Sequence, residues 1–240
     1  VHINAGVAAL VGALLLGPRI GYGNEAMPPH NLPFTMVGAS LLWVGWFGFN
    51  VGSELAADGV AGLVLVNTIA ATGAAVLGWL LIESLLSGKS TMLGAATGAI
   101  AGLVAITPSC GSLGPIGSIV LGFIASIICF WACTSLKKAF GYDDSLDVFG
   151  VHGVAGIVGA VGTGILMSAS FGGVGYGEGV TMGAQTTVQI LSVLITIVWS
   201  AIVSLILFKL VDAIIGLRPS EEDERKGLDA TSHGESSYNL

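Results

Sequence analysis

Long apolar runs alternate with short polar connections along the whole chain, which has 240 residues. The runs are continuous and rich in Ala, Leu, Ile and Gly, whereas a strand of a membrane barrel alternates over roughly ten residues. A helix needs about 20 mainly apolar residues to cross a bilayer. The pattern predicts an all-α polytopic membrane protein, a helix bundle with one truncated and about six full spans, at 1–17, 34–53, 59–85, 92–108, 115–136, 148–169 and 185–215.

Composition narrows the class of protein further. Charged residues make up 10% of the chain, hydrophobic residues 53%, and the mean hydropathy is +0.88. A soluble domain carries about 25% charged residues, so this chain has too little polar surface for water. An ordinary soluble enzyme, a disordered chain and a nucleic-acid binder are therefore excluded, and membrane lipid is the expected surrounding.

The basic residues predict the orientation in the membrane. Arg19, Lys89, the Lys137-Lys138 pair and the bases after 216 fall at alternate connections, and the other connections contain no Lys or Arg. Basic connections face the cytoplasm in most membrane proteins. We expect a multi-pass protein of the cell (plasma or inner) membrane, with a transmembrane domain at 1–216 and a cytoplasmic tail at 217–240.

Two segments of the chain repeat each other around a histidine. Val-His-Ile-Asn-Ala-Gly at 1–6 corresponds to Val-His-Gly-Val-Ala-Gly at 151–156, and six of the first twelve positions are identical at an offset of 150. The copies are five spans apart, and because successive spans alternate in direction, an odd separation makes them run in opposite directions. Such an inverted repeat predicts a substrate pathway near the bilayer midplane, between the repeats.

The repeated histidines are His2 and His152, and a histidine inside a membrane span is costly unless it meets a partner or a cavity. Each alone is explained equally well as a packing residue bonded to a backbone group. Their equivalence in the repeat favours a facing pair along one pathway. Neither has a Cys, Ser, Asp or Glu at helical spacing, so we expect no metal site, no catalytic residues and no enzyme.

Six longer motifs, in order along the chain, resemble the ammonium transporter (Amt/Mep/Rh) family. They are V-H-I-N-A-G (1–6), G-W-F-G-F-N-V-G-S (45–53), A-I-A-G-L-V-A-I-T-P-S-C-G (99–111), D-V-F-G-V-H-G-V-A-G-I-V-G (147–159), G-G-V-G-Y-G-E-G-V-T-M-G (172–183) and G-L-R-P-S-E-E-D-E-R-K-G-L-D (216–229). The resemblance implies homotrimers of eleven-helix protomers, each with its own pore. It also implies that this chain runs from the middle of helix five onward and that the N-terminal helices are missing.

The same resemblance assigns the candidate site. It implies that His2 and His152 are twin histidines at the pore centre, and that Trp46, Phe49 and Ser53 form an outer ammonium vestibule with Phe49 as a gate ring. These three lie at i, i+3 and i+7, on one face of a helix that ends at the outer side, although aromatic belts at the membrane interface have the same composition. Two further positions match apolar pore-lining residues, Leu42 and Val148.

Two carboxylates and the tail complete the expectations. Asp144 and Asp147 precede the span that contains His152, where they are expected to cap and support the start of the helix. The resemblance implies that the tail packs between protomers and docks a PII-type signalling protein. No cofactor is implied.

The function implied is ammonium or ammonia transport through an apolar pore with twin histidines. Ammonium is recruited at the outer aromatic vestibule and is deprotonated before passage. The alternative is an ammonium sensor of the same fold that signals through its C-terminal tail. Uptake by an ammonium-dependent strain distinguishes the two.

Overall fold

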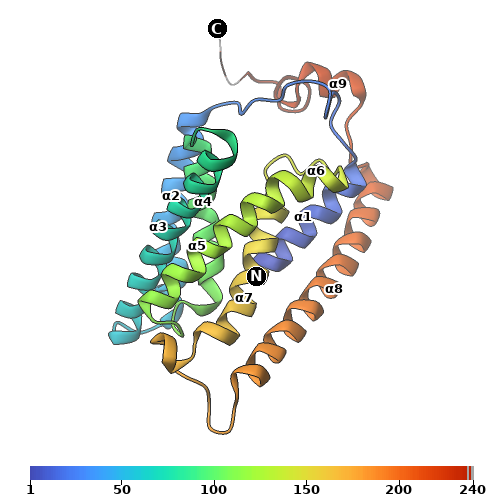
Figure 1. Ribbon diagram of the computed structural model, residues 1–240. Helices are drawn as coiled ribbons and strands as arrows, with labels where there is room; N and C mark the ends of the chain where they lie inside the picture. The colour runs from blue at the N-terminus through green and yellow to red at the C-terminus, as the bar shows by residue number, and fades with distance from the viewer. Residues whose placement is uncertain (237, 239–240) are drawn as a thin grey trace.

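The computed structural model describes residues 1–236 and 238, and in this part of the chain every regular element is a helix (Figure 1). The described residues include three π-helical segments: Ala132–Leu136 follows α5, Phe149–Gly153 precedes α7, and Asp229–His233 lies in the tail. The helices are α1 (His2–Leu16), α2 (Leu32–Asn50), α3 (Gly59–Ser87), α4 (Met92–Ile106), α5 (Pro115–Trp131), α6 (Lys137–Phe140), α7 (Val154–Leu166), α8 (Met182–Ile215) and α9 (Glu221–Lys226).

Six helical stretches of the described chain are long and apolar enough to cross a membrane. They are Leu32–Glu54, Gly59–Ser87, Met92–Ser109, Pro115–Phe140, Phe149–Leu166 and Met182–Ile215, and the apolar helix His2–Leu16 is shorter. The prediction of an all-α membrane bundle with six full spans and one short span is therefore confirmed, and each predicted span overlaps the observed one.

Polar residues set the helix boundaries in the way that their sequence positions suggest. The side chains of Asn31, Asp58, Thr91 and Thr181 each accept a hydrogen bond from a backbone N–H in the first turn of the helix that follows. These bonds satisfy donors that have no partner within the helix. Gly88 ends α3 in the left-handed conformation, with φ of 80°.

The main core lies where α3, α4, α5 and α7 pack together, and small residues allow close packing there. A second, smaller apolar cluster joins α1, α7 and α8 around Ile3, Val7 and Val193. α2 and α8 lie on the outside of the bundle (Figure 1), and most of their large apolar side chains are exposed. Exposed apolar helix faces are expected where the surrounding medium is lipid or another membrane helix.

The connections gather at two ends of the bundle. We name as the basic end the one formed by residues 17–31, 88–91 and 141–148, which lies at the top of Figure 1, where residues 217–236 of the tail also lie. The opposite end consists of the connections around residues 51–58, 107–114 and 167–181. Because the helices alternate in direction, Arg19, Lys89 and Lys137 all lie at the basic end, as their spacing predicts.

Candidate functional site: a histidine pair at the crossing of two repeated helices

The two repeated segments meet each other in the structure. Gly6 of α1 lies so close to Gly153, which immediately precedes α7, that a Cβ atom at Gly6 would overlap the Gly153 backbone. The repeat-equivalent contact joins Gly156 to Ile3, where a Cβ atom at Gly156 would lie 3.0 Å from Ile3 Cγ1. The crossing is thus approximately symmetric. Because Gly6 and Gly156 have no Cβ atom, the two backbones can approach each other closely.

This crossing brings the two histidines side by side. The ring centroids of His2 and His152 are 5.9 Å apart, and the ring planes are inclined by 26°. Both side chains are half-buried. His2 is the first residue of α1, whereas His152 lies in the π-helical turn Phe149–Gly153. π-Turns within membrane helices alter the direction of side chains locally and are frequent at functional sites.

α2 supplies two aromatic rings beside His2. The indole of Trp46 is stacked on the His2 ring, with centroids 5.1 Å apart and planes inclined by 14°. Phe49 meets His2 edge-on at 5.8 Å and meets Trp46 edge-on at 5.6 Å. Trp46 is only 8% exposed, whereas Phe49 is 43% exposed. Phe49 therefore faces the open side of the site and Trp46 lies deeper, against the histidine.

Ser53 lies beyond these rings, toward the opposite end of the bundle. It belongs to the short 3-10 turn Gly52–Glu54 that follows α2, and its side chain is exposed. The Ser53 hydroxyl donates a hydrogen bond of 2.5 Å to the Phe49 carbonyl. Leu42 is one turn from Trp46 in the other direction, with a 51% exposed side chain. Phe49 and Ser53 are therefore both exposed, as a vestibule requires, whereas Trp46 is buried against His2 and does not line an open outer vestibule.

A threonine that the sequence did not single out holds Trp46 in place. The indole Nε1 donates a hydrogen bond of 2.9 Å to Thr107 Oγ1, and the Thr107 hydroxyl donates one of 2.7 Å to the Leu103 carbonyl. Thr107 lies just beyond the last residue of α4, in the 3-10 turn Thr107–Ser109. In the sequence, only its position in the A-I-T-P-S-C-G motif pointed to Thr107 as a residue of the site.

The two aspartates at the basic end have different roles. Asp144 is 5% exposed, and its carboxylate accepts a hydrogen bond of 2.7 Å from the Phe149 N–H, which begins the helical segment containing His152. The Asp147 carboxylate instead forms an ion pair of 2.5 Å with Lys137. Asp147 supports the helix through its carbonyl, which accepts from the Val151 N–H. Val148 lies at the N-cap of the same turn and is half-buried.

Burial governs the ionisation of Asp147. It raises the pKa of this carboxyl above its ordinary value, and the hydrogen bond and charge of Lys137 offset only part of the effect. Asp147 also has a positive φ of 55°, which is uncommon for a residue other than glycine. The Lys137 contact therefore holds a strained and partly buried residue five positions before His152.

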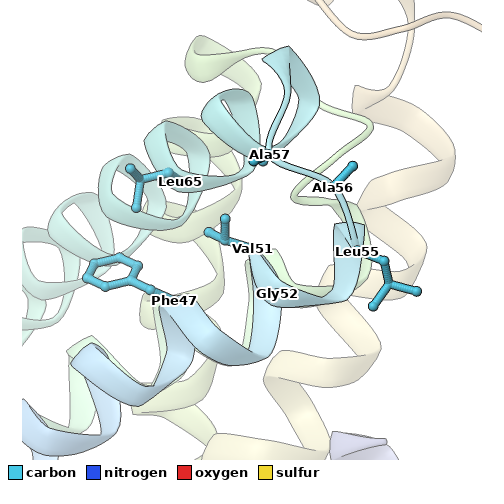
Figure 2. A pocket seen from close by; sticks show the side chains of 8 residues that line it. Phe47, Val51, Gly52, Leu55, Ala56, Ala57 and Leu65 are labelled. Atoms are coloured by element: carbon cyan, nitrogen blue, oxygen red, sulfur yellow. The ribbon is translucent and has the colours of Figure 1, made fainter.

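A hollow at the end of α2 lies apart from the histidine site. A volume of about 500 Å³ lies between the ends of α2 and α3, and Figure 2 shows Phe47, Val51 and Leu65 on its walls. Its lining side chains are apolar, and Phe47 and Val51 project from the face of α2 opposite to Phe49 and Ser53. It therefore offers no polar side chain to a small ion.

Metal coordination has no support in residues 1–236 and 238. This part of the chain contains no group of three or more His, Cys, Asp or Glu side chains that could hold a metal ion. The histidine pair thus consists of two imidazoles among aromatic and aliphatic side chains. Such a pair can exchange hydrogen bonds with a small polar molecule or pass a proton between its two rings.

Comparisons with known proteins give a consistent result. A family model described as Ammonium Transporter Family matches residues 1–238. The ammonium transporter of Bacillus subtilis (strain 168) is 47% identical over 240 residues, covering 99% of this chain and 59% of the relative. The ammonium transporter of Aquifex aeolicus (strain VF5) is 48% identical over 242 residues, covering 100% of this chain and 56% of the relative.

Solved structures share the fold. A structure named Sensor Amt Protein superimposes with a TM-score of 0.89 at 30% identity, covering 97% of this chain and 58% of that chain. The crystal structure of Candida albicans Mep2 superimposes with a TM-score of 0.82 at 31% identity, covering 93% of this chain and 51% of that chain. The chain thus spans between half and three-fifths of the length of these proteins.

Proposed function

Because the chain belongs to the ammonium transporter family, we propose that it contributes the twin-histidine part of a pore for ammonium or ammonia. The observation that carries this proposal is the stacked pair of His2 and His152, at the crossing of two helices that repeat each other in sequence. The curated relatives are named transporters, which indicates a protein without enzymatic activity. The chain spans little more than half of these relatives, so the activity is proposed for the full gene product.

Recruitment takes place at the exposed end of the α2 face. The Ser53 hydroxyl gives its hydrogen to the Phe49 carbonyl, so the hydroxyl oxygen is left to accept a hydrogen bond from ammonium. The half-exposed ring of Phe49 adds an electrostatic attraction for a cation above its face. At this depth the ion keeps part of its hydration, and its charge is tolerated.

Passage beyond Phe49 proceeds as ammonia. Moving a bare cation into an apolar membrane interior is costly, and breaking one N–H bond removes the charge. The electron pair of that bond stays on nitrogen as ammonia, and the proton is taken by a ring nitrogen of the histidine pair. Ammonia then exchanges hydrogen bonds along His2 and His152. Potassium is similar in size to ammonium but has no proton to lose, so the apolar section rejects it.

The proposed orientation places the basic end and the C-terminus in the cytoplasm of a cell with this protein in its plasma or inner membrane. The support is that Arg19, Lys89 and Lys137 all lie at that end. Residues 1–216 form the transmembrane domain of this proposal, and 217–240 form its regulatory tail. A reporter enzyme that is active only outside the cytoplasm should stay inactive when fused after Leu240.

We further propose that the full protein is a homotrimer whose tail docks a PII-type signalling protein. The exposed apolar faces of α2 and α8 are compatible with contacts between membrane helices. The tail is charged and is hydrogen-bonded to Leu16 at the end of α1 and to Ile20 just after it. It therefore lies outside the membrane-spanning helices, where a soluble partner can reach it. Cross-linking in native membranes tests the trimer, and co-purification with a PII protein tests the partner.

The test of the pore is the substitution His152→Ala in the full gene product. We expect a lower ammonium flux or a weaker selectivity against potassium, measured in vesicles with matched protein content. His30→Ala is the control, because His30 lies in the connection at the basic end, where its ring is 5.2 Å from that of Tyr238 and tilted by 37°. Unchanged flux and unchanged selectivity in His152→Ala would sink the pore-pair proposal.

A sensor function is the second candidate, favoured by one observation. The structure with a TM-score of 0.89 is named Sensor Amt Protein, and it matches 97% of this chain. In this reading the tail signals and transport is incidental. A full gene product that never supports growth of an ammonium-dependent strain on low ammonium, yet binds ammonium, would favour the sensor over the transporter.

A further inference from the structure

Besides its apolar packing, α2 is hydrogen-bonded to the rest of the bundle by two buried side chains. Three of its residues are buried, namely Ala39, Trp46 and Asn50, and the last two each donate a hydrogen bond to a threonine on a neighbouring helix. Trp46 Nε1 donates to Thr107 Oγ1 at 2.9 Å, and Asn50 Nδ2 donates to Thr68 Oγ1 at 3.1 Å. Both bonds run from a side-chain N–H to a threonine hydroxyl, but only Trp46 also contacts His2.

The hydroxyl groups of the two threonines also donate hydrogen bonds in the same way. Thr107 donates its hydroxyl hydrogen to the Leu103 carbonyl and Thr68 donates to the Val64 carbonyl, each at 2.7 Å and four residues back along its own helix. Each hydroxyl hydrogen is therefore committed, and each oxygen presents a lone pair in a fixed direction. At Thr107 that direction determines where the indole N–H must point.

Trp46 in turn limits the movement of the His2 ring. The two rings are inclined by only 14° with centroids 5.1 Å apart, and Phe49 closes another side edge-on at 5.8 Å. A rotation of the imidazole about its bond to the Cβ atom would drive its edge into the indole face. His2 is the first residue of α1, so few contacts within the helix restrain it.

We propose that Trp46 and Thr107 are positioning residues that fix the orientation of the His2 ring relative to His152. Thr107 acts only through Trp46, and Trp46 acts through the ring stack. This inference rests on the proposed function, because it assumes that the orientation of the pair decides what passes. A histidine held in one orientation presents its ring nitrogens to the pathway without a reorganisation cost at each passage.

The test is Thr107→Val in the full gene product, which removes the hydroxyl while keeping a β-branched side chain of similar shape. We expect the ratio of ammonium to potassium flux to fall about five-fold, the factor that corresponds to one lost neutral hydrogen bond. Thr107→Ser should restore the ratio, because its hydroxyl can still accept from the indole. Changed selectivity in Thr107→Val with rescue by Thr107→Ser supports the proposal, and an unchanged ratio in Thr107→Val overturns it.

Thr68→Val is the matched control. It removes the other hydrogen bond that docks α2, with the same bonding pattern, but its partner Asn50 has no ring that could stack on His2. Both valine variants should lose similar thermal stability in detergent, whereas only Thr107→Val should change selectivity. An equal change in selectivity in both variants would show that Thr107 merely docks α2.

A readout independent of transport separates this inference from the proposed function. The structure of the Thr107→Val protein, determined by cryo-electron microscopy, should show the Trp46 and His2 rings no longer nearly parallel, while Thr107→Ser and Thr68→Val retain the stack. Unchanged rings in Thr107→Val overturn the inference even if the parent protein transports ammonium. If Thr107→Val does not fold, Trp46→Phe tests the same contact, because it keeps a ring but lacks the N–H.

Discussion

In the proposed recruitment step, Ser53 selects a cation by the direction of its hydroxyl hydrogen. Its hydrogen is given to the Phe49 carbonyl, so toward the open side the hydroxyl presents only lone pairs. A molecule that approaches must be a donor, as ammonium is with each of its four N–H bonds. Because Ser53 is exposed, the interaction competes with water and is modest in strength.

The corresponding prediction is that Ser53→Ala weakens apparent ammonium affinity with little effect on the maximal rate. We expect the half-saturating concentration to rise about ten-fold or less, the effect of one hydrogen bond to a charged group at an exposed position. Ser40→Ala is the control, because Ser40 lies on the same helix, is exposed and makes the same kind of bond to the carbonyl four residues back. A drop in maximal rate at unchanged affinity would remove Ser53 from the recruitment step.

The spacing of residue types along the chain predicted which side chains belong to the site. It could not predict which residues on other helices form hydrogen bonds with them. The repeat pointed to His2 and His152 together, and the structure places them side by side. The hydrogen bond from Trp46 to Thr107 joins residues 61 positions apart, and nothing in one sequence says which threonine faces which indole. Which residues of two helices meet depends on how each helix is rotated about its own axis. A sequence that is apolar on every side of the helix gives little information about that rotation.

Two π-helical turns face each other next to the histidine pair. Gly150 lies in the turn Phe149–Gly153, and a Cβ atom there would lie 2.5 Å from Cys133 Sγ, in the turn Ala132–Leu136. The spans that contain these turns were predicted as uninterrupted helices. A π-turn inserts one residue into the helical ladder without changing composition, so hydrophobic periodicity gives no signal for it. The turn nevertheless determines the direction of His152.

The crossing of α1 with the turn before α7 gives a second prediction, at the level of helix packing. Gly6→Ala should destabilise the full gene product or abolish its assembly, because the new methyl group would overlap the Gly153 backbone, which cannot rotate away. Overpacking of this kind costs about 1–3 kcal/mol or more. Gly45→Ala in α2 is the control, because nothing lies within 4 Å of a Cβ atom there. Equal melting temperatures for the two variants would contradict the close crossing.

The same two helices are tied together at the basic end by Arg19 and Asp143. The Asp143 carboxylate accepts hydrogen bonds of 2.8 Å from the Arg19 backbone N–H and from Nε and Nη2 of its guanidinium, and the aspartate side chain is 2% exposed. Burial disfavours the charge on Asp143, but the bonds and charge of Arg19 outweigh it and hold the pKa of that carboxyl below its ordinary value. A group with a lowered pKa stabilises the folded state above the pKa of the unfolded chain.

A third prediction follows for the pH dependence of stability. Near neutral pH, Asp143→Asn should lower the melting temperature by about 2–4 °C, as expected from a loss of about 1 kcal/mol in a protein of this size. The contribution of Asp143 is lost as the pH falls below its ordinary pKa of 3.8 and through the lower folded value, so the two melting curves should converge there. A difference in melting temperature that stays constant down to low pH would show that the ionisation of Asp143 does not contribute to stability.

At the scale of the whole molecule, the tail is fastened to the helix that begins with His2. Arg218 donates a hydrogen bond of 2.9 Å to the Leu16 carbonyl at the end of α1, and the Glu224 carboxylate accepts one of 2.9 Å from the Ile20 N–H. Arg218 and Glu224 also pair with each other at 2.9 Å. A cavity of about 720 Å³ remains between the tail and the basic end. The tail therefore contacts the C-terminal end of α1, the helix that begins with His2, directly.

The last prediction concerns this attachment, and it separates docking of the tail from the stability of the short helix α9. Glu224→Ala removes the acceptor of the Ile20 N–H and the partner of Arg218, so the tail should detach more often. Trypsin should then cut after Arg225 or Lys226 roughly five-fold faster, because cleavage follows the population of the open form. Glu222→Ala removes only an exposed pair with Lys226 within α9, and exposed pairs of this spacing contribute little. Similar cleavage rates in the two variants would mean that the tail is not held by Glu224, whereas faster cleavage in Glu224→Ala alone would establish the residue as the link between the tail and α1.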